Sequence, residues 1–146
     1  LMNLYFVCQR YQEAYEAASA IVAMDQGDEF YRASLYYAAR SLMLLGKKDE
    51  AKNAYKEALG IYRLVNIENP SAVDAYLFRA MAFKDIDEDN KALEMIEFIL
   101  NLTNELAEPY VIRAEIYKKQ GREEDAKLEL EKAYLIKPDL KGVYQA

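Results

Sequence analysis

Residues 107–140 read AEPYVIRAEIYKKQGREEDAKLELEKAYLIKPDL, and within them Ala114 precedes Ala126 by twelve positions. The same pair of small residues recurs upstream at the same spacing, as Ala39 with Ala51 and as Ala80 with Ala92. A large apolar side chain follows the first alanine of each pair by three positions, as Leu42, Phe83 and Tyr117. A fixed period between about twenty and fifty residues is typical of stacked repeats. The spacing therefore predicts a repeat architecture.

The composition favours an all-α chain that forms a single domain. The 146 residues include 53% hydrophobic and 30% charged side chains, which is the balance of a globular protein. The chain has only five Gly and three Pro, and the alternation typical of strands is hard to find. We expect helices over residues 1–9, 11–25, 29–45, 48–66, 71–84, 88–102, 109–121 and 122–136, with a further helix beginning near 140.

The expected helix pairs divide the domain 1–146 into units at about 1–28 (partial), 29–72, 73–106 and 107–140, followed by the start of a helix at 140–146. The step from Ala51 to Ala92 is 41 residues, whereas the step from Ala92 to Ala126 is 34. The seven additional residues fall at 60–66 and extend the second helix of unit 29–72 by about two turns. Because the chain begins and ends inside helices, we expect it to be a fragment of a longer protein.

The repeated residues resemble the tetratricopeptide repeat, a motif of about 34 residues. The segment 107–140 matches that motif at Tyr110, Ala114, Tyr117, Gly121, Ala126, Leu130, Ala133 and Pro138. The preceding units match at Tyr76, Ala80, Phe83, Ala92 and Ile96, and at Leu35, Ala39, Leu42, Gly46, Ala51, Tyr55 and Ala58. The resemblance implies a right-handed α-solenoid of antiparallel helix pairs. Each pair is too small to bury its own apolar face, so successive pairs must stack.

The resemblance also implies a binding face, because the first helix of each pair lines the concave side of such solenoids. In this sequence that face is largely apolar and aromatic, and it comprises Phe6, Tyr36, Tyr37, Arg40, Met43, Leu77, Phe78, Met81, Val111, Ile112 and Glu115. Residues 30–45 are apolar almost all round the expected helix and need burial on more than one side.

We therefore predict a non-catalytic scaffold that binds an apolar or amphipathic protein segment in a concave groove. Tyr36, Tyr37, Phe78 and Met81 are the expected anchors, because buried aromatic side chains dominate such interfaces. The opposing interpretation is that many of these side chains interdigitate with the next repeat and leave little of the groove exposed. The alternative function is self-association, through the groove or through uncapped ends of the stack.

Charge and length narrow the class of partner. The net charge is −6 and the Lys and Arg residues are dispersed, which argues against nucleic acid. No apolar run approaches the roughly twenty residues of a membrane span. With one cysteine and no visible targeting segment, a cytoplasmic protein is expected.

The sequence favours no catalytic site, cofactor or metal. It contains no His to serve as a general base or to activate Cys8. Residues 85–90, DIDEDN, resemble the start of a calcium loop, but that loop needs Gly sixth and Glu twelfth, where this chain has Asn90 and Ile96. We interpret residues 85–90 as a turn between helices. Arg79 and Arg113 could bind anions. We favour the interpretation that the stem of each side chain covers a neighbouring helix while its charged end stays in water.

Overall fold

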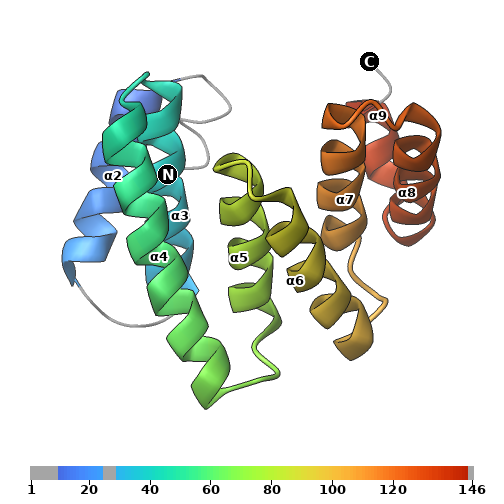
Figure 1. The fold of residues 1–146 in the computed structure, drawn as a ribbon. Coiled ribbons are helices and arrows are strands. Elements are labelled where there is room, and N and C mark those ends of the chain that lie inside the picture. The colour runs from blue at the N-terminus through green and yellow to red at the C-terminus, as the bar shows by residue number, and fades with distance from the viewer. Residues whose placement is uncertain (1–9, 25–28, 145–146) are drawn as a thin grey trace.

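The computed structural model describes residues 10–24 and 29–144. Every regular element within them is a helix, which confirms the predicted all-α class (Figure 1). The expected helix over residues 1–9, and Phe6 and Cys8 with it, lies outside the described residues. The elements are α2 (Tyr11–Met24), α3 (Glu29–Leu44), α4 (Lys48–Glu68), α5 (Val73–Asp85), α6 (Asp89–Leu102), α7 (Glu108–Lys119), α8 (Glu123–Ile136), the 3-10 helix η1 (Pro138–Leu140) and α9 (Lys141–Tyr144).

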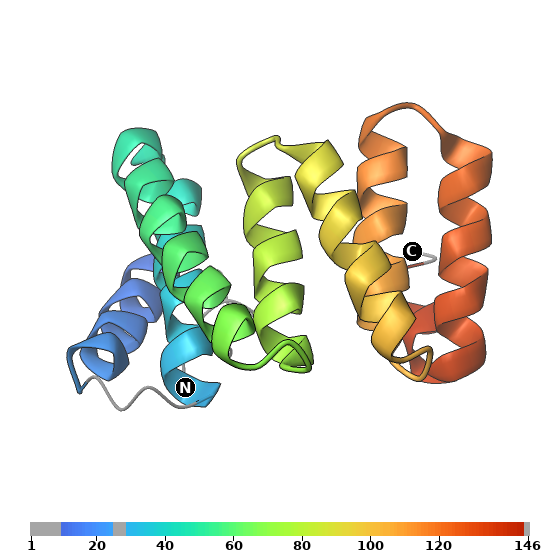
Figure 2. The same ribbon diagram turned by 60° about the horizontal axis from the view of Figure 1, so that its bottom comes forward.

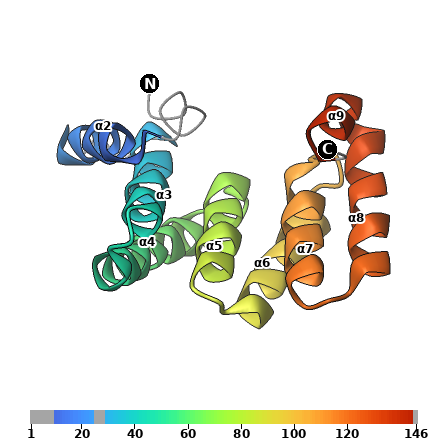
Figure 3. The same cartoon turned by 90° about the horizontal axis from the view of Figure 1, so that it is seen from above.

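Consecutive helices pack as pairs that stack into a curved array. We call α3 with α4 the second repeat, α5 with α6 the third and α7 with α8 the fourth. Seen from above, α3, α5 and α7 lie along the inner side of the curve, α4 and α6 lie along its outer side, and α8 closes the far end (Figure 3). Figure 2 shows the pairs following one another along the molecule. This is the predicted solenoid, in which each pair covers the apolar surface of the next.

The repeated alanines lie where the two helices of a pair meet. All of them are buried, from 0% exposed at Ala39, Ala51, Ala80 and Ala92 to 4% at Ala126. A methyl side chain lets two helix backbones approach closely, and larger neighbours fill the remaining space. Those neighbours include Tyr55 in the second repeat and Ile96 in the third, both fully buried.

The turns inside the repeats need a left-handed backbone residue. Glycine supplies it twice, at Gly46 with φ 82° and at Gly121 with φ 78°. The equivalent residue of the third repeat is Asp87, with φ 63°. Aspartate tolerates this conformation better than most residues because its short polar side chain bonds locally. The third repeat therefore closes the same turn without a glycine.

Helix α4 is longer than the helices that occupy the same place in the later repeats. It has 21 residues, whereas α6 and α8 have 14 each. Its C-terminal end extends past α5 in Figure 1. Buried Asn66 in this extension donates from Nδ2 to the Ala72 carbonyl at 3.1 Å, which ties the extension to the start of the third repeat.

Candidate protein-interaction groove

An apolar groove lies on the inner side of the solenoid, between α5 and α7. It has a volume of about 310 Å³ and is lined by Tyr36, Met81, Lys84, Glu108, Val111, Ile112, Glu115 and Leu140. These residues belong to α3, α5, α7 and η1, so three successive repeats build one groove. Five of the residues predicted for the binding face are among them, namely Tyr36, Met81, Val111, Ile112 and Glu115.

The floor of the groove is apolar and well packed. Val111 and Ile112 are 7% and 6% exposed. Ile112 packs with Ile116 in the core between the third and fourth repeats, and Val111 packs against Leu140. Met81 is only partly buried and packs against the cores on both sides of α5. Met81 is therefore the apolar side chain of α5 that a bound segment could reach.

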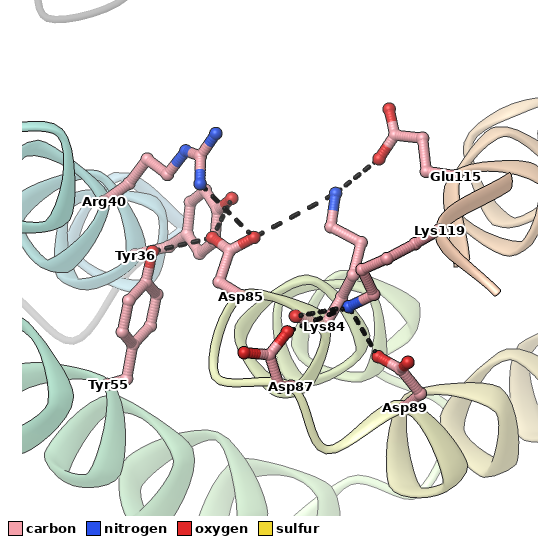
Figure 4. Close-up of polar contacts among 9 residues, drawn as sticks. All are labelled: Tyr36, Arg40, Tyr55, Lys84, Asp85, Asp87, Asp89, Glu115 and Lys119. Atoms are coloured by element: carbon pink, nitrogen blue, oxygen red, sulfur yellow. Dashed lines mark hydrogen bonds and ion pairs between the residues drawn. The ribbon is translucent and has the colours of Figure 1, made fainter.

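Charged side chains border the apolar floor. Lys84 of α5 donates a short hydrogen bond from Nζ to the Glu115 carboxylate of α7, which spans the groove (Figure 4). Glu108 is exposed at the start of α7 and takes part in no ion pair among the described residues. The edge of the groove thus presents one carboxylate that has no cationic partner within the described part of the chain.

Beside the groove, a buried carboxylate joins the second repeat to the third, a contact that we call the earlier interface. The side chain of Asp85 is 3% exposed, and its Oδ2 accepts hydrogen bonds from the hydroxyls of Tyr36 at 2.8 Å and Tyr55 at 2.6 Å. Arg40 Nη1 lies 3.5 Å and Lys84 Nζ 4.0 Å from Oδ1 (Figure 4). A charge this deeply buried is tolerated only because it is hydrogen-bonded and paired.

The same environment shifts the two tyrosines. Burial, and then the nearby Asp85 charge, raises the pKa of Tyr36 and the pKa of Tyr55 far above the ordinary value of about 10. Both hydroxyls therefore stay protonated and remain donors to Asp85 at every physiological pH.

The contact between the third and fourth repeats, which we call the later interface, includes ion pairs of Lys119 that solvent reaches. Lys119 Nζ lies 2.8 Å from Asp89 Oδ1 and 3.1 Å from Asp87 Oδ1 (Figure 4). This ammonium group occupies the centre of the acidic turn 85–90. No group of residues suited to holding a metal ion is present in the part of the chain that the structure describes.

Tyr36 and Phe78, two of the predicted anchors for a partner, take part in packing between the second and third repeats. Tyr36 is 5% exposed, and its ring packs at centroid distances of 6.0 Å from Phe78 and 6.1 Å from Tyr55. Phe78 also stacks on the buried ring of Tyr62 at 5.5 Å. These rings fill the earlier interface, because the long helix α4 brings Tyr62 against α5. Such packing is what the opposing interpretation of the sequence predicts, and the role of both residues as anchors stays a prediction.

The remaining predicted residues within the described part of the chain, Tyr37, Arg40, Met43 and Leu77, are not among those that line the groove. Arg40 is engaged with Asp85. Tyr37 and Met43 pack on the core of the second repeat, and Leu77 packs on the core of the third. The sequence did not indicate Glu108 and Leu140 as lining residues. The sequence does hold a signal for Leu140. It is an apolar residue that lies two positions after Pro138, where the preceding helix stops.

The favoured interpretation of the two arginines is wrong for Arg113. Its guanidinium donates to Glu129 at 2.8 Å and to Glu97 at 2.7 Å, and its side chain is 13% exposed. Arg79 donates to Asn66 Oδ1 at 3.1 Å, and its Nε is buried without a partner. The reason is that both arginines lie on the side of their helix that faces the longer second helices of the repeats, so the charged ends are enclosed.

Comparison with known proteins agrees with the geometry. The sequence profile described as the tetratricopeptide repeat matches residues 33–63 and 107–140. These two segments are tetratricopeptide repeats. No curated protein sequence matches it significantly. The solved structures that it resembles include a thermophilic tetratricopeptide-repeat protein of Thermus thermophilus, with a TM-score of 0.71 and 21% identity over 99% of this chain and 76% of that one.

Other similar structures are forms of the protein MamA. One matches with a TM-score of 0.52 and 21% identity over 99% of this chain and 78% of that one. Another, from Desulfovibrio magneticus, has a TM-score of 0.53 and 16% identity over 94% of this chain and 93% of that one. At these identities the likeness shows the fold.

The tetratricopeptide repeats indicate the class of function. Tetratricopeptide repeats form scaffolds for protein–protein interaction, and this chain is such a scaffold. Proteins of the family are typically non-catalytic. Among the described residues, no helix is both long and apolar enough to cross a bilayer.

Proposed function

We propose that the groove between α5 and α7 binds an amphipathic segment of a partner protein. The observation that carries the proposal is the groove itself, in which apolar side chains from three successive repeats line about 310 Å³ on the concave side. A concave apolar site with a few polar groups at its edge is the usual form of a binding site.

The charges at the edge suit a partner segment that carries a basic residue. Glu108 has no ion pair within the described residues and is exposed beside Val111. The chain as a whole has a net charge of −6. A segment that places an apolar side chain over Met81 and Ile112, with a Lys or Arg near Glu108, would satisfy both features.

The test uses a displayed library of peptides about 15 residues long, long enough for four helical turns. Peptides are selected on the wild-type protein and measured by calorimetry. Met81→Lys places a charge in the apolar floor and should weaken binding of the selected peptides by about tenfold or more. Leu64→Lys is the matched control, since Leu64 is 63% exposed on the outer helix α4. Circular dichroism should show that both variants keep the wild-type helix content.

Glu108→Arg gives a second test that does not disturb packing, because Glu108 is exposed. It should weaken peptides that carry a basic residue and spare neutral ones. The proposal fails if selection yields no groove binder, or if Met81→Lys and Leu64→Lys bind the selected peptides equally well.

A further inference from the structure

Arg79 and Arg113 hold the same position in the third and fourth repeats, because each directly precedes the first alanine of its pair. Two acids enclose Arg113. Glu97 of α6 lies 16 positions before it, and Glu129 of α8 lies 16 positions after it. The guanidinium donates to Glu97 at 2.7 Å and to Glu129 at 2.8 Å. Arg113 therefore shows which groups this position takes when the chain supplies them, namely one carboxylate from each neighbouring helix.

Around Arg79 neither acid is present. The positions 16 before and 16 after it hold Arg63 of α4 and Met95 of α6. Met95 is buried at the position of Glu129, and Arg79 Nε is buried without a hydrogen-bond partner. Arg79 Nη1 donates instead to the neutral side chain of Asn66, at 3.1 Å. Within the described part of the chain, neither Arg63 nor Arg79 forms an ion pair.

The two arginines lie close together. Arg63 precedes Asn66 by three positions, so it shares the face of α4 that meets Arg79. Burial lowers the pKa of Arg79 and the charge of Arg63 acts in the same direction, whereas Tyr76 and Glu94 act in the opposite one. Helices α4 and α6 form the outer side of the solenoid (Figure 3). The arginine pair is therefore separate from the groove between α5 and α7.

An anion from solution can reach the space between the two guanidinium groups. Beside Arg113 the equivalent space belongs to Glu97, whose side chain is 64% exposed. Arg63 is exposed as well, and Arg79 is only partly buried. The Arg79 guanidinium lies 5.7 Å from the centre of the Tyr76 ring, a cation–π contact that helps to hold it in place. A ligand would therefore meet one positioned guanidinium and one exposed guanidinium.

We propose that Arg63 and Arg79 together bind a phosphate monoester group. The planar fork of N–H donors on a guanidinium matches the oxygens of a phosphate or a carboxylate. A phosphate monoester carries a charge of about −1.5 to −2 at pH 7, which balances two guanidinium groups better than the single charge of a carboxylate. Phosphorylated protein side chains and small phosphorylated compounds share this group, so either is a possible source of the ligand.

A titration with methyl phosphate at about pH 7.5 and constant ionic strength, followed by NMR of the arginine Nε–H groups, tests the site. The Arg79 signal should shift with a dissociation constant of about 1–10 mM, and acetate should bind about tenfold more weakly or less. Arg63→Glu reproduces the pairing of Glu97 with Arg113, so it should abolish the shift. Lys127→Glu is the matched control, since it makes the same change of charge at an exposed residue of α8. Circular dichroism should show unchanged helix content in both variants.

A library of phosphoserine peptides then distinguishes the two sources. A member that binds about tenfold more tightly than methyl phosphate, and loses this affinity in Arg63→Glu, identifies a phosphorylated protein segment; a library without such a member indicates a small phosphorylated compound. The proposal is overturned if methyl phosphate causes no shift in the wild type, if Arg63→Glu and Lys127→Glu bind it equally well, or if acetate binds as tightly. Peptide binding in the groove should be the same in Arg63→Glu and wild type.

Discussion

The earlier and later interfaces join successive repeats of one fold by opposite means. At the earlier interface a buried carboxylate, Asp85, accepts bonds from two tyrosine hydroxyls. At the later interface an exposed ammonium group, Lys119, meets two aspartates of the preceding turn. Asp85 and Lys119 occupy the same place, five residues after Ala80 and Ala114 respectively. Either sign of charge serves at this position when the preceding repeat supplies the matching groups.

The apolar packing beside these charged groups also differs between the two interfaces. The earlier interface is aromatic, with Phe78 stacked on Tyr62, and an ion pair of 2.7 Å between Arg32 and Asp74 supports it. The later interface is aliphatic, with Ile112 and Ile116 against Ile96. Buried polar networks fix one arrangement and are costly to break, whereas exposed ion pairs contribute little. The earlier interface should therefore be the more rigid and the more specific of the two.

The largest effect that we predict is on Asp85. Asp85→Asn should lower the free energy of unfolding in urea at pH 8 by about 3 kcal/mol, because the amide leaves Arg40 without its carboxylate and presents a donor to the tyrosine hydroxyls. The matched control is Asp87→Asn at the later interface. Asn also tolerates the left-handed backbone of that residue, so the expected loss there is about 0.5 kcal/mol or less. Equal losses at the two sites would remove the distinction between the interfaces.

High pH should act on the earlier interface. Tyr55 has a pKa raised by burial and by Asp85, so as pH rises above about 10 the unfolded chain ionises this tyrosine while the folded chain does not. Stability that is fully present below about pH 10 is then lost, by about 1.4 kcal/mol per pH unit for each such tyrosine. Between about pH 9 and about pH 11, urea unfolding of Tyr55→Phe should show a total loss of stability smaller by about 1.4 kcal/mol than that of the wild type.

Two results would check that interpretation. Asp87→Asn should keep the wild-type slope, because it changes no tyrosine. If Tyr55→Phe also keeps the wild-type slope, the alkaline loss of stability arises elsewhere in the chain and the buried hydroxyl is not its source.

The fold was predictable because its signals are local. The alanine spacing and the turn glycines Gly46 and Gly121 lie within single repeats, and they led to the all-α solenoid that the structure confirms. In the third repeat Asp87 has the left-handed backbone that Gly46 and Gly121 have in the other two. The register of the repeats alone is enough to locate this position.

The buried polar cluster could not be predicted in the same way. Asp85 meets Tyr36 and Tyr55 from 49 and 30 residues away, so no local pattern distinguishes it from the exposed aspartates that follow. The same limit applies to the predicted anchors Tyr36 and Phe78. The sequence placed them on the inner face, but it did not indicate how closely they pack against each other and against α4. A usable signal was that Tyr36 carries a hydroxyl at a position where the later repeats have Leu77 and Val111.

The smallest effect that we predict is the response of the later interface to salt. Lys119 is 41% exposed and Asp87 is 84% exposed, so solvent ions reach both. Raising NaCl from about 0.05 M to about 0.5 M shortens the screening length to a few ångströms and should weaken these pairs by about 0.5 kcal/mol in total. Amide hydrogen exchange should then report about a twofold loss of protection at the start of α6 and the end of α7, with little change in α3 and α5. Lys119→Met should have low protection at both salt concentrations and a smaller response to salt than the wild type. If Lys119→Met responds to salt as the wild type does, the ion pairs of Lys119 do not stabilise this interface.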